Sequence, residues 1–424
     1  MYQKTTLNNG LTLLTSPLST KSVTVMVFVK AGSRYEDKKN NGISHFLEHL
    51  FFKGTKKRPN KLAISKVMDE IGGEFNASTG REKTNFYTKT AADKIDIGFD
   101  LLSDILCNSL FRKEDIEKEK GVIIEEINMY KDDPEAKAGL ILEKIMWPIS
   151  PLGFNIAGEK KVIRELSRDS FLSYLKDLYK PNNMVVSIAG KFNKKKVLNL
   201  TKRYFGKLKK DKVKSFKRAR IVQEKPKASV FYKKTEQSHI CFGLHGYHAR
   251  DKRKYALSLM NIILGGGMSS RLFQEVREKR GLCYSISSSA VFFLDTGALV
   301  IEAGVDNKRV FEACEVILCE LDKLGKRQVS AEELKRAKEY FKGKTILAME
   351  ESNEVAQYVA GQLLSTGKIL TLSQLFKKID KVTEDDIQNV SSDIFKDSKL
   401  NLSLVGPFRK NRKFYDIIKM QADS

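Results

Sequence analysis

The chain has 424 residues and a mass of 48.1 kDa, a length at which two domains can each bury a core. Apolar residues make up 41% and charged residues 30%, which excludes a disordered polyelectrolyte, and no run approaches the roughly 18 apolar residues of a membrane-spanning helix. The five cysteines include no C-x-x-C pair and leave one thiol over, so we expect free thiols in a reducing compartment. With no basic and apolar leader at the N-terminus, the composition predicts a globular cytoplasmic protein without membrane contact.

The net charge of +24 raises the question of a phosphate-rich partner. Residues 206–227 hold ten basic and two acidic residues and few large apolar ones. No RNP motif, zinc finger or basic region followed by heptads accompanies them. We therefore predict a solvated basic linker and no specific nucleic-acid partner. The alternative, a nucleic-acid-binding protein with an incidental metal site, predicts binding that weakens steeply with salt.

Short strands and amphipathic helices follow one another along the first half of the chain. Alternating or continuous apolar runs predict strands at 5–7 and 11–14 (around an Asn-Gly turn), 23–29, 86–90 and 185–189. Apolar residues spaced i, i+3, i+4 and i+7 predict helices at 43–53, 61–71, 91–108, 113–130 and 168–179. Because strands and helices do not alternate one to one, we predict an α+β fold with mainly antiparallel sheets.

An internal repeat gives the domain organisation. Residues 169–192 and 385–408 match at a shift of 216, which pairs Ser187 with Ser403 and Gly190 with Gly406. Both copies pass from a helical pattern to an extended apolar run that ends in Gly-x-Phe. We predict two homologous domains, at 1–205 and 229–424, joined by the basic linker at 206–228.

Two of the five histidines lie in the segment NGISHFLEHLFFKGT, as His45-x-x-Glu48-His49. On a helix, residues four apart point the same way, so both imidazoles share a face, with Glu48 about 60° to one side. Neutral imidazoles suit Zn²⁺, and a neighbouring carboxylate can take a proton from a water that the metal binds. The pattern is the inverted zinc-peptidase motif, H-x-x-E-H. The alternative is two structural histidines that happen to share a face.

A catalytic zinc usually has three protein ligands, so the motif needs a third. The helix predicted at 113–130 contains Glu119 and Glu126, seven apart and therefore on one face, together with the apolar Ile116 and Ile123. Carboxylates on a partly apolar face cost free energy unless a cation or hydrogen bonds compensate them. Glu125 should face solvent. An ordinary charged helix explains Glu119 equally well when that residue is taken alone.

With these residues, the sequence resembles the pitrilysin/insulinase-type zinc peptidases, and most closely the branch of mitochondrial processing peptidase and its bacterial relatives. In that family H-x-x-E-H is followed after about 75 residues by a V-I-x-x-E segment. Here 76 residues separate His49 from Glu126, which ends Val-Ile-Ile-Glu-Glu. The resemblance implies His45, His49 and Glu126 as ligands of one zinc per chain, Glu48 as the base, and Glu119 as a residue that supports the site.

The resemblance extends to both halves. Gly72–Thr79 matches G-G-x-x-N-A-x-T, an edge strand that implies Asn76 and Ala77 as substrate-binding residues through β-augmentation. In the second half, the segment 265–287 resembles the stretch that carries an Arg/Tyr pair, here Arg277 and Tyr284. These two are implied to donate to the scissile carbonyl. Taken without the resemblance, they are a surface arginine and a packed tyrosine.

The predicted function is therefore a zinc metalloendopeptidase that hydrolyses short or unfolded polypeptides bound in extended form. The strongly basic composition argues against specificity for basic presequences. The resemblance implies that a chain of this length acts as a dimer. Because one chain holds both the zinc set and the Arg/Tyr pair, we expect a homodimer, with a heterodimer containing a degenerate homologue as the alternative. The rival function is a non-catalytic scaffold or assembly subunit of the same superfamily. His245 and His248 have no third ligand at a suitable spacing and are interpreted as structural.

Overall fold

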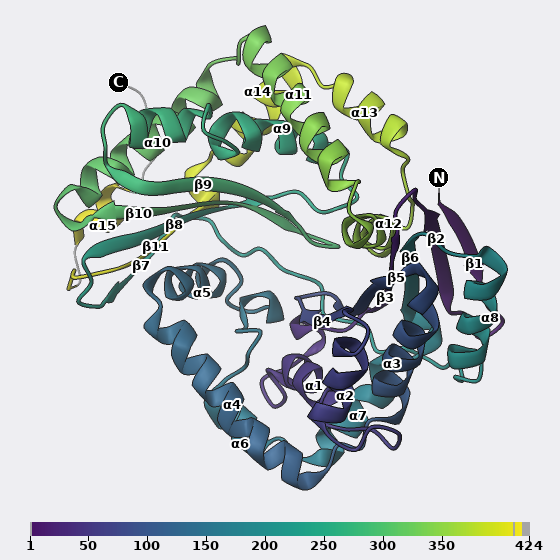
Figure 1. Cartoon of the computed structure of the whole chain (residues 1–424). Helices are drawn as coiled ribbons and strands as arrows, with labels where there is room; N and C mark the ends of the chain where they lie inside the picture. The colour runs from purple at the N-terminus through teal and green to yellow at the C-terminus, as the bar shows by residue number, and fades with distance from the viewer. Residues whose placement is uncertain (1, 410–411, 418–424) are drawn as a thin grey trace. The chain divides into compact units, whose positions relative to one another are not determined.

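The computed structural model describes residues 2–409 and 412–417, which form two compact units. Unit 1 contains 2–128, 154–217 and 346–369, and unit 2 contains 129–153, 218–345 and the described residues from 370 onward. Each unit is a mainly antiparallel sheet packed with helices (Figure 1), so the predicted α+β fold class is confirmed.

Unit 1 is built on a six-stranded sheet of order β1-β2-β6-β3-β5-β4. All neighbouring strands are antiparallel except β2 and β6. The strands are β1 (Gln3–Thr6), β2 (Thr12–Pro17), β3 (Ser22–Val29), β4 (Glu74–Thr79), β5 (Thr84–Ala91) and β6 (Met184–Gly190). The central strand β3 reads SVTVMVFV, and its alternate residues enter two cores because helices cover both faces. Val25 and Val27 enter the larger core, and Met26 and Phe28 enter the smaller one.

The helices of unit 1 are α1 (Ile43–Phe51), α2 (Lys61–Asp69), α3 (Ile95–Asn108), the part of α4 (Lys113–Asp132) up to 128, α6 (Lys160–Glu165), α7 (Arg168–Leu178), α8 (Lys194–Phe205) and α12 (Ser352–Thr366). Helices α6, α8 and α12 were not predicted, and the others lie close to their predicted positions. The helix predicted from 91 begins later, at Ile95. Ala91 instead pairs with Ser22 in the sheet, and a short 3-10 turn follows at Ala92–Lys94.

Unit 2 repeats this plan with a five-stranded sheet of order β7-β11-β8-β10-β9. The strands are β7 (Lys227–Tyr232), β8 (Gln237–Gly246), β9 (Cys283–Phe292), β10 (Gly297–Asp306) and β11 (Leu400–Gly406). The helices are α5 (Pro134–Met146), α9 (Lys254–Gly265), α10 (Val310–Lys326), most of α11 (Ala331–Ala348), α13 (Leu372–Asp380), α14 (Glu384–Ile394) and α15 (Arg412–Ile417). Figure 1 shows α9, α10 and α14 on one face of this sheet and α5 on the other.

The repeat found in the sequence is present in the structure at the same shift. Helix α7 and strand β6 correspond to α14 and β11, residue for residue. Both helices begin with a capping box, at Ser167 and at Thr383. The two sheets also share their strand order from β2 and β7 onward, so β1 has no counterpart in unit 2.

Each half of the chain contributes one helix to the other unit. Helix α5 lies before the linker in sequence and packs in unit 2, while α12 lies in the second half and packs in unit 1. The repeated serines mark this exchange. Ser187 donates a hydrogen bond to the carbonyl of Ala356 at 2.8 Å, and Ser403 donates to the carbonyl of Ala138 at 2.7 Å. Each compact unit is therefore built from separate stretches of the sequence, whereas each predicted domain is one continuous stretch.

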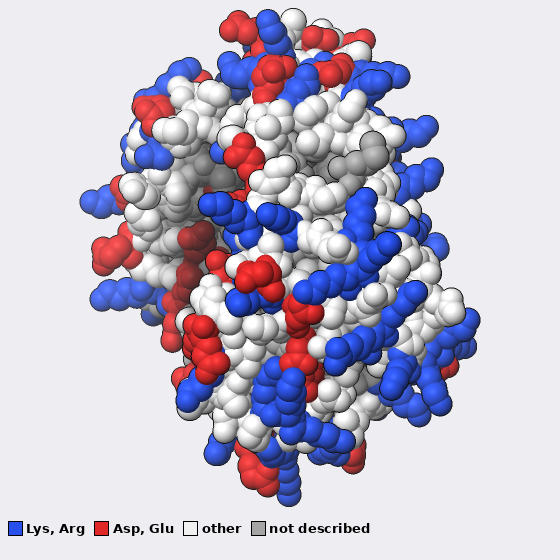
Figure 2. Space-filling view, turned by 45° about the vertical axis from the view of Figure 1, so that its right-hand side comes forward, with Lys and Arg blue, Asp and Glu red and all other residues white. Residues whose placement is uncertain are grey.

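The basic segment 206–226 forms no regular strand or long helix, and most of its lysines are exposed. Within unit 1 it is fastened by partly buried Leu208, Val213 and Phe216, the last of which packs edge-on against Tyr35 at 5.4 Å. Figure 2 shows lysine and arginine side chains spread over the viewed face with carboxylates among them. Among the described residues, no helix has the length and apolar character needed to cross a membrane.

Candidate metal centre

Helix α1 carries both histidines of the motif on one side. Its other side is apolar, and Phe46, Leu47 and Leu50 are buried in the core of unit 1. His45 and His49 are one turn apart, and their ring centroids are separated by 4.7 Å. The side chains are 12% and 22% exposed, so both imidazoles are partly accessible to solvent.

Helix α4 brings Glu126 to the same place. One of its oxygens lies 3.4 Å from His45 Nε2 and the other lies 3.5 Å from His49 Nε2. These distances exceed the usual 2.7–3.2 Å of an N–H···O hydrogen bond. Bonds of about 2.0–2.1 Å to a tetrahedral zinc place neighbouring ligand atoms roughly 3.4 Å apart. The spacing of the three side chains is therefore that of ligands sharing one ion.

Among the described residues, His45, His49 and Glu126 form the one group of three or more His, Cys, Asp or Glu side chains compact enough for a metal, with ligand atoms within 4.8 Å of one another. Two imidazoles and one carboxylate are a donor set that suits Zn²⁺ and leaves a position open for water. The residues present thus fit the ion that the sequence motif implies.

Glu119 orients His49 from behind. It is buried, about two turns before Glu126 on α4, and one of its oxygens accepts a hydrogen bond from His49 Nδ1 at 2.8 Å. This bond keeps the proton on Nδ1 and leaves the Nε2 lone pair directed to the site. The second oxygen pairs with the ammonium of Lys53, just beyond α1. Lys53 was not predicted as part of the site, although its position four residues after His49 indicated that it would lie near this histidine.

Electrostatics around the site favour bound cations. Burial lowers the pKa of His45, but Glu126, Glu48 and Glu36 outweigh burial and the net pKa is raised. Burial raises the pKa of Glu119, but the hydrogen bonds from His49 and Lys53 outweigh it and the net pKa is lowered. Carboxylates therefore dominate the local potential.

Glu48 lies on α1 directly before His49, on the side of the helix next to the face that the two histidines share. Its Oε2 atom is buried and has no hydrogen-bond partner among the described residues. An unpaired buried carboxylate oxygen is costly, and such an atom beside a ligand cluster is a candidate proton acceptor. Glu125, in contrast, is exposed, as its position on the helix predicts.

The predicted substrate-binding residues lie on the edge strand of unit 1. Asn76 and Ala77 belong to β4, which pairs only with β5 and is the last strand of its sheet. The Asn76 side chain accepts a bond from the Ala77 amide at 2.8 Å. Backbone groups on the other side of β4 face no strand of the described chain, which is the arrangement that β-augmentation requires.

Arg277 and Tyr284 lie together in unit 2. Arg277 belongs to a π-helical turn, Phe273–Glu278, a feature frequent at functional sites. Its guanidinium carbon lies 4.7 Å from the centroid of Phe273 and 5.4 Å from that of Tyr284. Tyr284 is 76% exposed at the start of the edge strand β9, so the predicted packed alternative does not hold for it.

His245 belongs to the core of unit 2. It is 2% exposed, with its ring 5.9 Å from that of Trp147, and burial together with Lys227 and Lys399 lowers its pKa to about 4. His245 and His248 belong to no metal-competent group of the described residues.

Fold and site together define the class: a two-unit α+β protein with an inverted zinc-peptidase motif on one helix and a carboxylate supplied by a second. Comparison with family models gives the same result. Residues 11–160 match the model described as insulinase (peptidase family M16), and residues 165–341 match the peptidase M16 inactive domain. All three members of the histidine–glutamate cluster lie within the first match.

Relatives of known sequence match along the whole chain. An uncharacterized zinc protease of Streptomyces coelicolor is 34% identical over 414 residues, covering 96% of this chain and 90% of the relative. The zinc protease YmxG of Bacillus subtilis is 33% identical over 409 residues, covering 96% and 98%. The chain belongs to the insulinase family, peptidase family M16, and the predicted family is confirmed.

Solved structures of other proteins have a similar fold. A protease from Helicobacter pylori superposes with a TM-score of 0.91 at 25% identity, covering 96% of this chain and 99% of that one. A Pseudomonas fluorescens structure described as a peptidase M16 inactive domain has a TM-score of 0.88 at 18% identity, covering 97% and 99%. The second likeness concerns the fold alone.

Proposed function

We propose that this chain is a zinc-dependent endopeptidase that hydrolyses peptide bonds in short or unfolded polypeptides bound in extended form. The observation that carries the proposal is the cluster of His45, His49 and Glu126, whose ligand atoms are spaced for one zinc ion, beside the unpaired oxygen of Glu48. Family membership and relatives named zinc proteases support it.

Each residue has a role in this proposal. His45, His49 and Glu126 would hold one zinc, which when bound would polarise a carbonyl and activate a water. Glu48 would accept a proton from the attacking water and return it to the leaving amine. Strand β4 holds the peptide backbone at Asn76 and Ala77. Sequence-tolerant main-chain pairing suits substrates of broad sequence.

Arg277 and Tyr284 are proposed as donors to the bound peptide, because the phenol is exposed and the guanidinium stacks on it.

We also propose a homodimer, because one chain supplies both the ligand set and this pair. All five cysteines are free thiols, which supports a reducing compartment.

The test is cleavage of a quenched fluorescent peptide library by the wild type and by Glu48→Gln, with Glu125→Gln as the matched control on an exposed carboxylate. Loss of a general base typically lowers kcat by about 10²–10⁴-fold. We expect Glu48→Gln to retain zinc and lose cleavage, and Glu125→Gln to match the wild type. A wild type that binds no zinc and cleaves nothing would favour the scaffold function, whereas one that binds zinc and cleaves nothing would point to a missing partner subunit or a folded-protein substrate.

A further inference from the structure

The helix that carries both histidines has no capping side chain of its own. Its N-cap residue is Gly42, in the left-handed region at φ 95°, and no side chain of the N-cap accepts a hydrogen bond. The free amides at the start of a helix need acceptors, and a buried helix end without them is unstable.

The carboxylate of Glu36, six residues upstream and outside the helix, supplies these acceptors. Its Oε2 accepts from the Gly42 amide at 2.8 Å and from Asn41 Nδ2 at 3.0 Å. Its Oε1 accepts from the Ser44 amide at 2.9 Å and from the Ser44 hydroxyl at 2.6 Å. One carboxylate therefore replaces the missing N-cap and binds the residue immediately before His45.

The contacts of Glu36 are buried and tie α1 to a second helix. Glu36 is 4% exposed and Ser44 is fully buried. The Ser44 hydroxyl also lies 2.6 Å from the hydroxyl of Tyr174 on α7, which in turn donates to the carbonyl of Gly32 at 3.3 Å. Burial raises the pKa of Glu36, and the hydrogen bonds from Ser44, Gly42 and Asn41 oppose that rise without cancelling it, so the net pKa is raised. All four bonds come from donors, so the ionised form satisfies each of them.

We propose that Glu36 is a positioning residue of the metal site, which fixes the first turn of α1 and hence the direction of the His45 imidazole. The inference rests on the proposed zinc endopeptidase function. Residues that orient ligands from outside the coordination shell typically change metal affinity or activity 10–100-fold. A negative charge at a helix N-terminus is also favourable.

Glu36→Gln tests this role with almost no change in volume. An amide has one oxygen and one NH₂ group, so in either orientation at least one backbone amide, that of Gly42 or that of Ser44, meets another donor. We expect zinc affinity, measured by competition with a chromophoric chelator, to fall about tenfold or more. We expect kcat to fall with KM nearly unchanged, and the visible spectrum of the cobalt-substituted protein to change.

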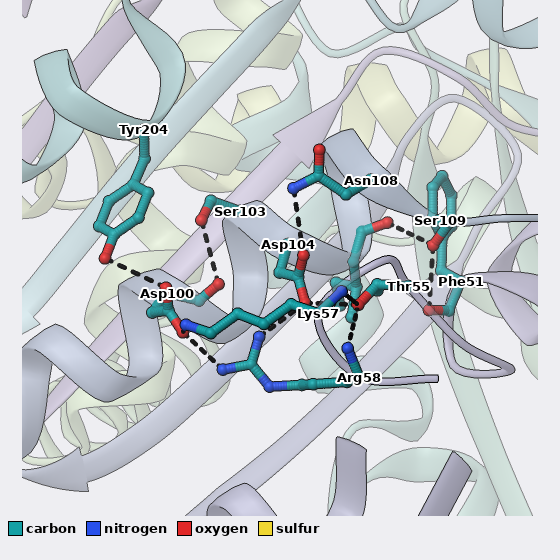
Figure 3. Close-up of polar contacts among 11 residues, drawn as sticks. Phe51, Thr55, Lys57, Arg58, Asp100, Ser103, Asp104, Asn108, Ser109 and Tyr204 are labelled. Atoms are coloured by element: carbon teal, nitrogen blue, oxygen red, sulfur yellow. Dashed lines mark hydrogen bonds and ion pairs between the residues drawn. The ribbon is translucent and has the colours of Figure 1, made fainter. Parts of the chain in front are cut away.

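The matched control is Asp104→Asn. Asp104 is also a buried carboxylate in unit 1, and Figure 3 shows it bonded to Thr55, Arg58 and Asn108. Its Oδ2 accepts from the Thr55 hydroxyl at 2.6 Å and from Arg58 Nη1 at 2.6 Å. It holds the loop after α1 rather than the helix itself. We expect Asp104→Asn to lower stability and to bind zinc as the wild type does.

Ser44→Ala is the milder variant to use if Glu36→Gln does not fold, because it removes only one of the four donors. It should weaken zinc binding by about threefold, which is less than the effect usual for residues outside the coordination shell. Unchanged zinc affinity in the variant that folds overturns the inference. So does an equal loss in Asp104→Asn, because the effect would then be general destabilisation. A wild type that neither binds zinc nor cleaves peptide overturns the proposed function, and the Glu36 inference with it.

Discussion

At the scale of single residues, Glu119 decides which nitrogen of His49 can act as a ligand. Its bond to Nδ1 leaves Nε2 free, and its second oxygen neutralises Lys53. Without this carboxylate, the tautomer of His49 would no longer be fixed, and the Lys53 ammonium would be unpaired beside a cation site. Both effects would weaken zinc binding.

We therefore predict that Glu119→Ala lowers zinc affinity about 10–100-fold. The control is Glu117→Ala on the same helix, whose side chain is 57% exposed and pairs with Lys120. Chelator competition on the two variants measures the difference. Equal zinc affinity in Glu119→Ala and the wild type would show that Glu119 does not orient the ligand.

The sequence predicted the residues of the site whose placement depends on helix periodicity. His45 and His49 share a face because they are four apart, and Glu119 and Glu126 because they are seven apart. The pairing of the two helices came from the family resemblance, since no spacing within either helix determines it. No pattern in the sequence indicated the role of Glu36, because this residue lies outside the helix and reaches it only through a folded loop.

At the scale of elements, helix α5 is an integral part of unit 2. Leu142 is 2% exposed there, and a side chain at Gly243 of β8 would meet Leu142 at 3.0 Å and Met146 at 2.5 Å. The helix and the sheet are thus in direct contact with no spare space.

Leu142→Ala should lower the free energy of unfolding by about 2–5 kcal/mol, because it removes a buried side chain and leaves a cavity. Leu62→Ala, at a position 63% exposed, should change it by less than about 0.5 kcal/mol. Urea denaturation measures both. A cost for Leu142→Ala no larger than that of Leu62→Ala would contradict the packing of α5 against this sheet.

The repeat was visible in sequence because α7–β6 and α14–β11 keep the same length, caps and buried strand. The exchange of α5 and α12 was not visible, because an amphipathic helix shows which of its faces is buried and not which sheet it packs on. The late start of α3 has a similar cause. Alanines at 91 and 92 favour a helix, yet pairing with β3 extends the strand through Ala91.

At the scale of the whole molecule, composition predicted a globular protein, the internal repeat predicted its two domains, and the comparisons established its family. The charge of +24 said little about function, because basic side chains are spread among acidic ones on the surface viewed in Figure 2. Net charge is evidence on solubility and association rather than on fold.

The proposed homodimer predicts a mass of twice the 48.1 kDa chain by light scattering at micromolar concentration. The physical reason is that one chain carries the complete set of proposed catalytic residues and needs no unlike partner. A single-chain mass, or assembly only with a second gene product, would contradict it.

The account depends most on one zinc held by two imidazoles and a carboxylate. Zinc K-edge X-ray absorption of protein purified without chelator tests this directly. It should show about one zinc per chain with nitrogen and oxygen neighbours at about 2.0–2.2 Å, and Glu126→Ala should lose that signal. Absence of zinc, or sulfur neighbours at about 2.3 Å, would contradict the assignment of His45, His49 and Glu126.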